Sequence, residues 1–158
     1  MKYQGISKTS LNNGEGLRAV LWVSGCSHRC AGCQNKDFWN ANMGLTFTEE
    51  VINELIDLCE RPFMDGLTLS GGDPMYVENR VEVYLLCRKF KERLGDKKTI
   101  WMYTGYLFEE IKDDPVMKYV DVVVDGPYQK DRDAAIYRGS DNQRIFRKRN
   151  GEWEEADR

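Results

Sequence analysis

The sequence predicts an α/β fold built on a mainly parallel sheet, because short apolar runs alternate with segments of helical periodicity. The apolar runs lie at 19–23, 66–69, 99–103 and 120–124, as expected of short buried strands. Strands that alternate with helices are joined by right-handed crossovers, which makes the sheet parallel. A closed eight-stranded barrel needs about 250 residues, so these 158 residues predict an incomplete βα barrel or an open sheet.

The three expected helices carry start and stop signals. The first follows Thr48, a favourable N-cap, and ends before Pro62. The second is expected from about Asn79 to Leu94, where a Gly-Asp pair stops it, and a short third helix from Leu107 to Lys112. In parallel α/β folds the loops after the strands meet at one edge of the sheet, and ligands bind there.

Outside this alternation the pattern is less regular. Gly14 and Gly16 flank one residue just ahead of the first strand, which predicts a turn with positive φ. Residues 35–47 show no clean period and are expected to form a short helix or a loop. From about residue 127 the chain becomes polar, and the basic run at 144–149 is expected to be a solvated face.

The composition argues against several classes of protein. A net charge of −3 without a basic stripe disfavours nucleic-acid binding. No apolar run approaches the ~20 residues that span a bilayer, and the N-terminus lacks the apolar core of a signal peptide. Five cysteines, an odd number, point to a reducing cytoplasm. Cys59 and Cys87 lie in helical patterns and are expected in the core of a single domain, 1–158.

The segment Ser24–Asn35, here called the cysteine loop, concentrates the chemistry of the chain. It places Cys26, Cys30 and Cys33 at the spacing Cys-x3-Cys-x2-Cys, directly after the first predicted strand. Thiolates this close together repel one another unless a metal shares them. A four-iron cluster with one iron lacking a protein ligand fits three cysteines, and zinc with His28 as fourth ligand is the rival.

A second motif, Ser70 to Pro74, follows the second predicted strand. Gly71 and Gly72 carry no side chains, so the backbone there can approach a ligand closely. Asp73 adds an acceptor suited to an ammonium group. Since the loops after parallel strands meet at one edge, this motif and the cysteine loop are expected to face one site together with 104–106 and 125–127.

Cys26-x3-Cys30-x2-Cys33 followed by Ser-Gly-Gly-Asp-Pro resembles the cluster and methionine-binding motifs of the radical S-adenosylmethionine activating enzymes. The resemblance spans nearly the whole chain and is closest to the branch that activates anaerobic ribonucleoside-triphosphate reductases. Two positions depart from the wider superfamily, because Gly32 replaces an aromatic residue and Asp73 replaces a glutamate. Both changes are familiar in that branch. The segments that carry the wider match are 14–18, 101–106, 124–126 and 138–143.

The resemblance implies a partial βα barrel of the radical S-adenosylmethionine type. It also implies a [4Fe-4S] cluster on the three cysteines, with S-adenosylmethionine bound to the fourth iron. Reductive cleavage of the cofactor would then yield a 5′-deoxyadenosyl radical that generates a glycyl radical on a partner. The implied partners are the large subunit of the anaerobic reductase and a low-potential electron donor. The residues implied to contact the cofactor are Gly32, Cys33, Gln34, Ser70, Gly71, Gly72, Asp73, Thr104 and Asp125.

Three alternatives stay open from the sequence. The chain could activate a different glycyl-radical enzyme, although such activases are usually longer and carry extra cysteines. It could be a radical enzyme acting on a small molecule, or a non-catalytic zinc-binding interaction module using His28. His28 and Arg29 are otherwise expected to be solvated, and the segment 138–143 either contacts a partner or caps the sheet.

Overall fold

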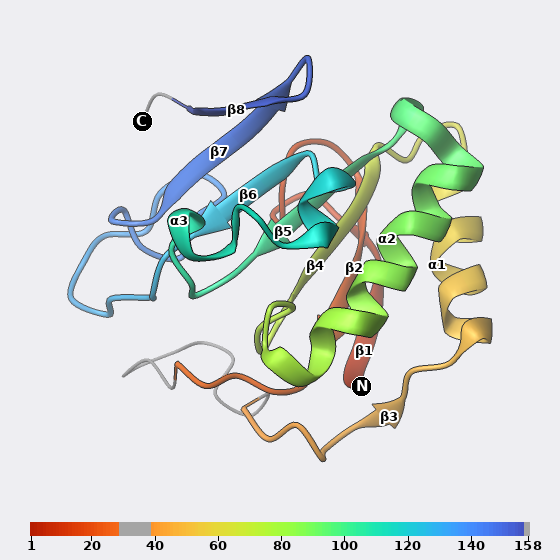
Figure 1. Cartoon of the computed structure of the whole chain (residues 1–158), viewed down its shortest axis with the longest axis horizontal. Helices are drawn as coiled ribbons and strands as arrows, with labels where there is room; N and C mark the ends of the chain where they lie inside the picture. Colours follow the sequence, from red (N-terminus) through yellow and green to blue (C-terminus); the bar gives the residue numbers. More distant parts are fainter. Residues whose placement is uncertain (29–38, 157–158) are drawn as a thin grey trace.

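The apolar runs form the centre of one mixed sheet in the computed structural model, which describes residues 1–28 and 39–156. Figure 1 shows the sheet with helices packed along it. The strands of the described residues are β1 (Lys2–Ser10), β2 (Arg18–Val23), β3 (Leu45–Thr46), β4 (Gly66–Gly71), β5 (Thr99–Tyr103), β6 (Val122–Asp125), β7 (Arg144–Arg149) and β8 (Glu152–Glu155). The helices are α1 (Glu49–Glu60), α2 (Arg80–Leu94) and α3 (Phe108–Ile111), with 3-10 turns η2 (Val77–Asn79), η3 (Gly95–Lys97) and η4 (Pro115–Lys118).

The sheet is mixed, so the prediction of a mainly parallel sheet was wrong. Within the described part of the chain the strand order is β3-β1-β2-β4-β5-β6-β7-β8. The central strands β2, β4, β5 and β6 pair in parallel, as the alternation of strands and helices predicted. The four outer pairings are antiparallel. They join β1 to β2 and β3 on one side of the sheet, and β7 to β6 and β8 on the other.

The four outer strands β1, β3, β7 and β8 escaped prediction, and β1 and β7 show the physical reason. Strand β1 is half-buried, and its scattered apolar residues do not alternate regularly. The basic run 144–149 was expected to be solvated, yet it forms β7, which pairs with the buried strand β6. The guanidinium groups of Arg144 and Arg147 lie over the rings of Phe146 and Trp101, and both arginines also have acidic partners. Strands of this kind look like polar tails in the sequence.

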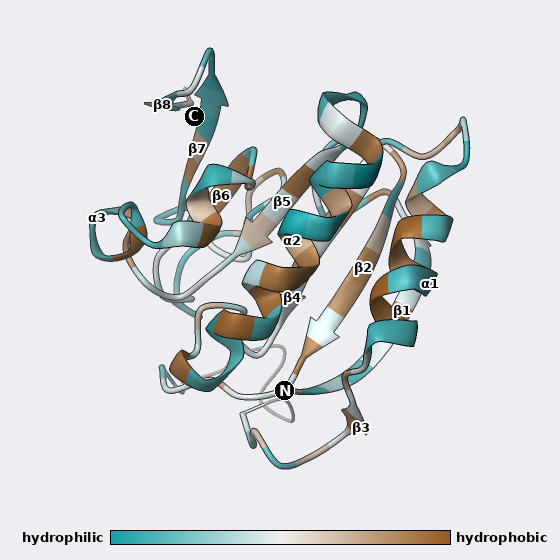
Figure 2. Cartoon of the chain, turned by 45° about the vertical axis from the view of Figure 1, so that its right-hand side comes forward, coloured by the Kyte–Doolittle hydropathy of each residue, from teal (hydrophilic) through white to brown (hydrophobic). Residues whose placement is uncertain are grey.

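Helices α1 and α2 cover one face of the sheet (Figures 1 and 2). Figure 2 shows apolar and polar sides on both helices. Leu21, Leu69, Met102 and Val123 come from adjacent strands and are fully buried in the core on this side. The helix boundaries agree with the prediction, and Gly95 ends α2 with φ of 61°. Thr48 occupies the N-cap of α1 without a capping hydrogen bond from its side chain.

The opposite face carries the alternate residues of the same strands. A smaller apolar cluster of Trp101, Val122 and Val124 lies there, and Tyr103 and Tyr137 pack against it. Because side chains alternate along a strand, Trp22 on β2 and Ser70 on β4 face the same side, where they are paired in register. Segments outside the regular elements cover this face, and they form the walls of the site described below.

Arg18 fastens the amino ends of three parallel strands on that face. Its side chain is only 1% exposed, and its guanidinium donates hydrogen bonds of 2.7–3.0 Å to acceptors on three segments. The acceptors are Thr68 Oγ1, the Leu67 carbonyl, the Thr99 carbonyl and hydroxyl, and the Glu15 carbonyl. No carboxylate among the described residues forms an ion pair with it, and burial lowers the pKa of Arg18 to about 10.

The turn ahead of β2 makes room for this arginine. Gly14 and Gly16 have φ of 114° and 82°, which confirms the predicted turn with positive φ. A Cβ on Gly14 would lie 2.9 Å from the Arg18 side chain and 2.8 Å from the ring of Trp101. Both glycines are therefore required by the backbone, and Gly14 also by the space that the arginine fills, whereas a Cβ on Gly16 would meet Asp65. Among the described residues no helix is long and apolar enough to cross a membrane.

Candidate functional site

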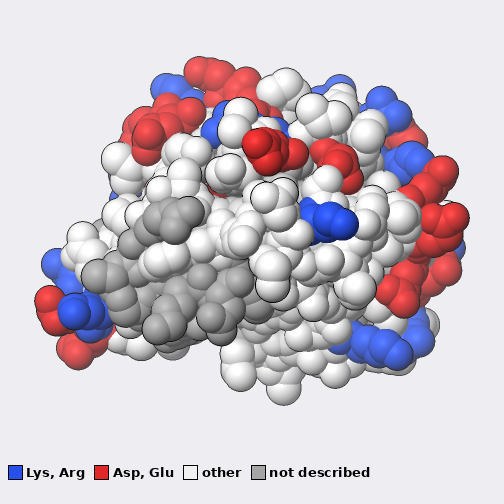
Figure 3. Space-filling model, turned by 90° about the horizontal axis from the view of Figure 1, so that it is seen from below, with Lys and Arg blue, Asp and Glu red and all other residues white. Residues whose placement is uncertain are grey.

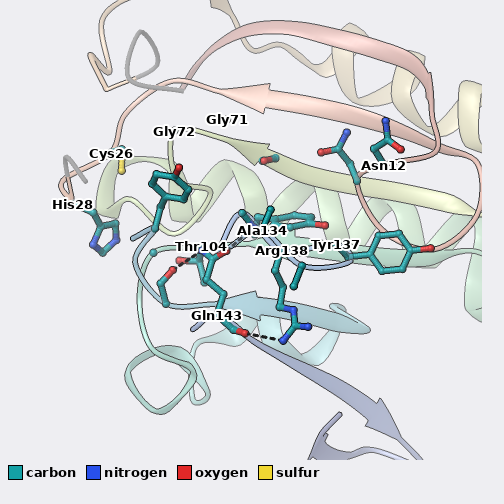
Figure 4. Close-up of a pocket in the computed structure, with 18 of the residues that line it drawn as sticks. Asn12, Cys26, His28, Gly71, Gly72, Thr104, Ala134, Tyr137, Arg138 and Gln143 are labelled. Carbon is teal, nitrogen blue, oxygen red and sulfur yellow. Dashed lines mark hydrogen bonds between the residues drawn. The ribbon is translucent and has the colours of Figure 1, made fainter. Parts of the chain in front are cut away.

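The carboxyl ends of the parallel strands converge on a cavity with a volume of about 540 Å³. It lies on the helix-free face, between the strand ends and the segment that follows β6 (Figure 4). Cavities of this size hold small molecules and cofactors. The lining residues are Asn12, Asn13, Trp22, Cys26, His28, Ser70, Gly71, Gly72, Tyr103, Thr104, Gly105, Gly126, Tyr128, Ala134, Ala135, Ile136, Tyr137, Arg138, Gly139 and Gln143.

The structure brings several of the residues singled out in the sequence to this cavity. Cys26 and the Ser70–Gly72 stretch line it from neighbouring strands, and Thr104 lines it from the end of β5. Asp73 and Asp125 lie at the same edge of the sheet but are not in the lining. The predicted ligands Cys30 and Cys33, and the predicted cofactor contacts Gly32 and Gln34, lie outside the described residues.

The cysteine loop and the Gly-Gly-Asp turn are joined directly through the backbone. The amide of Gly72 donates to the Val23 carbonyl at 2.8 Å, and the amide of Asp73 donates to the Gly25 carbonyl at 2.7 Å. Gly71 makes this approach possible, since a Cβ there would lie 2.5 Å from the backbone N and O of Val23. The two motifs are therefore one structural unit, and Cys26 follows it immediately.

Asp73 organises the neighbouring loop from a buried position. Its carboxylate is 1% exposed and accepts hydrogen bonds from the Thr104 hydroxyl at 2.8 and 3.0 Å, the Gly105 amide at 3.0 Å and the Met75 amide at 2.9 Å. This arrangement differs from the sequence-based expectation of a carboxylate free to receive an ammonium group. The aspartate instead shapes the edge of the cavity, and it holds the hydroxyl of Thr104 toward itself.

His28 is also held in place, so the expectation of a solvated side chain was wrong. Its Nε2 lies 2.8 Å from Asp73 Oδ2, although the N–H direction does not meet hydrogen-bond geometry. The imidazole packs edge-on against Tyr106, with ring centroids 4.5 Å apart, and its side chain is 18% exposed. Figure 4 shows His28 below Cys26 at the same end of the cavity.

Asp125 supports the end of β6 in a similar way. Its buried carboxylate accepts from the Phe108 amide at 2.7 Å and from the Arg144 guanidinium at 2.6 and 3.1 Å. Arg144 also binds Glu109, and this hydrogen bond lowers the pKa of the exposed Glu109 to about 2. The two carboxylates in turn raise the pKa of Arg144 above its usual value. Asp125 thus ties α3 and β7 to the strand end.

The segment after β6 forms the far wall of the cavity and is fixed by Gln143. The Gln143 side chain donates to the Gly126 carbonyl at 2.8 Å and accepts from the Gly139 amide at 2.8 Å. Tyr137 has φ of 62°, unusual for a non-glycine residue, and packs on Trp101 with ring centroids 5.4 Å apart. The polar segment 138–143 therefore caps the sheet, which was one of the two roles open from its sequence.

Tyr103 and Trp22 are site residues that the sequence reasoning missed. Both lie near strand ends on the helix-free face, so the two-residue alternation of side chains along β2 and β5 could have identified them. The Tyr103 hydroxyl is buried without a hydrogen-bond partner among the described residues, and burial raises its pKa well above the usual value. Tyr103 therefore contributes to the wall of the cavity, while its hydroxyl oxygen is enclosed by the protein.

The two remaining cysteines are predicted to be unreactive and dispensable for metal binding. Burial raises the pKa of the Cys59 thiol to about 11 and that of Cys87 to about 12. At a pH of about 8, fewer than about one in a thousand of these thiols is ionised. Iodoacetamide should leave both unmodified in the folded protein and modify both in denaturant, as measured by peptide mass spectrometry. Loss of bound iron in Cys59→Ala or Cys87→Ala would contradict a three-cysteine ligand set.

Comparison with known proteins agrees with this picture. Residues 12–146 match the family model described as a 4Fe-4S single cluster domain. The chain is 44% identical over 154 residues to an anaerobic ribonucleoside-triphosphate reductase-activating protein of Enterobacteria phage T4, which covers 97% of this chain and 98% of that protein. Proteins of the same name from Vibrio cholerae and Escherichia coli are 40% and 37% identical over 153 and 151 residues. These matches cover 93% and 90% of this chain, and 98% and 96% of the relatives.

Proposed function

Because the chain belongs to the family of anaerobic ribonucleoside-triphosphate reductase-activating proteins, we propose that it activates such a reductase by generating a glycyl radical on its large subunit. The observation that carries this proposal is the shared cavity. Cys26, the first cysteine of the cluster motif, lines the same cavity as the Ser70–Gly72 stretch, and the two segments are hydrogen-bonded at their base.

Of the three proposed cluster ligands, the described residues include Cys26, and its place at the end of the cavity supports a cluster with an organic cofactor beside it. Cys26 supplies one thiol at the end of the cavity, and Cys30 and Cys33 are the proposed remaining ligands. The cavity of about 540 Å³ is large enough for S-adenosylmethionine, and the glycines at 71 and 72 leave their part of its lining free of side chains. Trp22 and Tyr103 add aromatic residues to the same lining.

Held by Cys26, Cys30 and Cys33, a reduced cluster would supply the electron for reductive cleavage of S-adenosylmethionine, and the radical chemistry that this provides would remove a hydrogen atom from a glycine Cα of the reductase. The chain's own residues bind, orient and shield the reacting groups. Gly71 and Gly72 present backbone groups to the methionine end, and we propose that Gly32, Cys33 and Gln34 lie against the cofactor. The wall that contains Tyr137 limits access of water from the far side.

The roles of Thr104, Asp73 and Asp125 follow from their contacts. Thr104 lines the cavity. Its hydroxyl donates to Asp73 and its oxygen accepts from the Tyr106 amide at 3.2 Å, which leaves one lone pair that can accept from a bound adenosyl group. Asp73 and Asp125 shape the two loops that border the cavity. We propose that they act on the cofactor through these loops, with their carboxylates satisfied by the protein.

We further propose that residues 1–158 form one radical S-adenosylmethionine domain with an incomplete barrel. The parallel strands β2, β4, β5 and β6 would be its barrel portion, and the polar segment from about residue 127 supplies the missing wall. A barrel left open on one side admits a loop from a large partner. The protein would act in the cytoplasm, and it also needs a low-potential electron donor.

The face around the cysteine loop suits an encounter with another protein. In Figure 3, which views the molecule from below, most Lys, Arg, Asp and Glu side chains stand toward the periphery and uncharged residues fill much of the centre. Ile136, in the cavity wall, is 76% exposed. Few charged side chains near the centre of this face, together with an exposed isoleucine in the cavity wall, support a protein interaction site.

Anaerobic reconstitution of the purified protein with iron and sulfide tests this function. The reduced holoprotein, mixed with S-adenosylmethionine and the reductase large subunit, should give the doublet signal of a glycyl radical in electron paramagnetic resonance. Cys26→Ala should abolish the signal and most of the bound iron, since a thiolate ligand is lost. Cys87→Ala, which removes a buried thiol far from the cavity lining, is the matched control and should retain both.

Other outcomes identify the competing functions. A colourless protein with stoichiometric zinc and no cleavage of S-adenosylmethionine would show that the chain is a zinc-binding module. Cleavage without a glycyl doublet on the reductase would reject this substrate and favour another activase or a small-molecule enzyme.

A further inference from the structure

The side chain of His28 packs against other groups at the edge of the cavity and makes more contacts than a solvent-exposed loop residue would. Three separate groups surround its ring: the buried carboxylate of Asp73, the aromatic ring of Tyr106 and the backbone of Gly105. We propose that His28 is a positioning residue, which fastens the cysteine loop to the end of β5 and so fixes the place of Cys26 in the cavity. This role rests on the proposed function, because it concerns the loop that would hold the cluster.

Gly105 provides independent evidence that the imidazole of His28 packs at this place. A Cβ built there would lie 2.5 Å from Cδ2, 2.8 Å from Cγ and 3.0 Å from Nε2 of His28. The backbone of Gly105 is not in the left-handed region, so an alanine would be tolerated conformationally at this position. The absence of a side chain at 105 is therefore explained by the imidazole that lies over it.

Asp73 makes the attachment specific. Its carboxylate also receives the Gly105 amide and the Thr104 hydroxyl, so the surface under the imidazole is shaped by the same group that contacts Nε2. On the other side of Tyr106, the Arg80 guanidinium lies 5.3 Å from the ring centroid and holds the aromatic ring against α2. His28 therefore packs against a surface formed by the residues that follow β4 and β5.

The position of His28 in the sequence explains how its packing affects the cysteines of the cluster motif. His28 is separated by one residue from Cys26 and by one residue from Cys30, within the first interval of the cluster motif. Fixing the imidazole therefore restrains the backbone next to Cys26, and less conformational entropy remains to be lost when the cysteines bind metal. The histidine that could have been a zinc ligand instead has its Nε2 2.8 Å from a carboxylate oxygen of the protein.

A double-mutant cycle with His28→Ala and Gly105→Ala tests this role in the full-length chain. The first readout is the alkylation rate of Cys26 by iodoacetamide in the metal-free protein, followed by peptide mass spectrometry. The second is the iron and sulfide retained after reconstitution and gel filtration. His28→Ala should raise the alkylation rate by about tenfold, since about 1.4 kcal/mol of loop restraint is lost, and should lower cluster retention by at least about half.

Gly105→Ala should produce similar changes on its own, because its methyl group displaces the imidazole. In the His28→Ala background the same substitution should add less than about a factor of two, since nothing remains to be displaced. Additive effects of the two substitutions, or a His28→Ala variant with wild-type alkylation and retention, would overturn the role. His28→Gln, which restores a donor at the side-chain end, should recover part of the loss.

Two controls separate this result from other failures. Thermal unfolding of each metal-free variant should stay close to that of the wild type, because His28 is a loop residue outside the main core. If the wild-type protein takes up no iron and sulfide, the proposed function fails, and the alkylation rates of the metal-free chains still decide the role of His28.

Discussion

Replacing Arg18 by methionine should lower the free energy of unfolding by about 3 kcal/mol, because several buried acceptors lose their donor at once. Methionine has a similar length and fills the space, so the loss reports the hydrogen bonds more than a cavity. The acceptors left without the guanidinium are on β4, at the start of β5 and in the turn before β2. Urea denaturation of the metal-free protein measures the effect.

Two further variants test whether the loss of stability comes from the hydrogen bonds of Arg18. Arg18→Lys keeps a charge but has three donors instead of five, and should lose about half as much stability. Arg149→Met, at a side chain that is 69% exposed, should stay within about 0.5 kcal/mol of the wild type. If Arg18→Met also remains within about 1 kcal/mol, the network is not a major source of stability.

The second large effect is expected at Gly71, where alanine should cost at least about 3 kcal/mol and prevent cluster binding. Gly71 has φ of 113°, and an added Cβ would lie 2.5 Å from both the amide nitrogen and the carbonyl oxygen of Val23. These are backbone atoms of the paired strand, so they cannot move away without breaking the link between β4 and the cysteine loop. Denaturation and iron content together measure the damage.

Gly151→Ala is the matched control for backbone strain. Gly151 also has a positive φ, of 81°, but nothing lies within 4 Å of its added Cβ. It should therefore show only the conformational cost of about 1 kcal/mol and bind the cluster normally. Equal effects at the two glycines would mean that the close approach of the strands at Gly71 is unimportant.

The central fold could be predicted from the sequence because its signals are local. Continuous apolar runs and helical periodicity gave β2, β4, β5, β6, α1 and α2 close to their observed bounds. The outer strands could not be predicted in this way. Strand β7 has two adjacent apolar residues among basic ones, and it pairs with both β6 and β8. Its pairing with β6 depends on residues far away in the chain.

The site was predictable in part for the same reason. The rule that ligands bind where parallel strands end identified the loops after β2, β4 and β5, and these loops do line one cavity. The partners of individual side chains were not predictable. Asp73 and Asp125 were expected to face a ligand, but their carboxylates are occupied by hydrogen bonds whose donors come from distant segments. Only the three-dimensional structure shows such occupancy.

Arg18 has a consequence beyond the energy it contributes. Its planar guanidinium contacts groups on neighbouring parallel strands, and each contact requires a particular alignment of those strands. Sliding β4 or β5 by one residue would move Thr68 to the helix side and present apolar atoms to a buried charge. Misaligned sheets would therefore be strongly disfavoured during folding, and the correct alignment places Ser70 and Gly71 opposite the end of β2. A single buried charge at the amino ends thus selects the arrangement that assembles the cavity at the other end of the same strands.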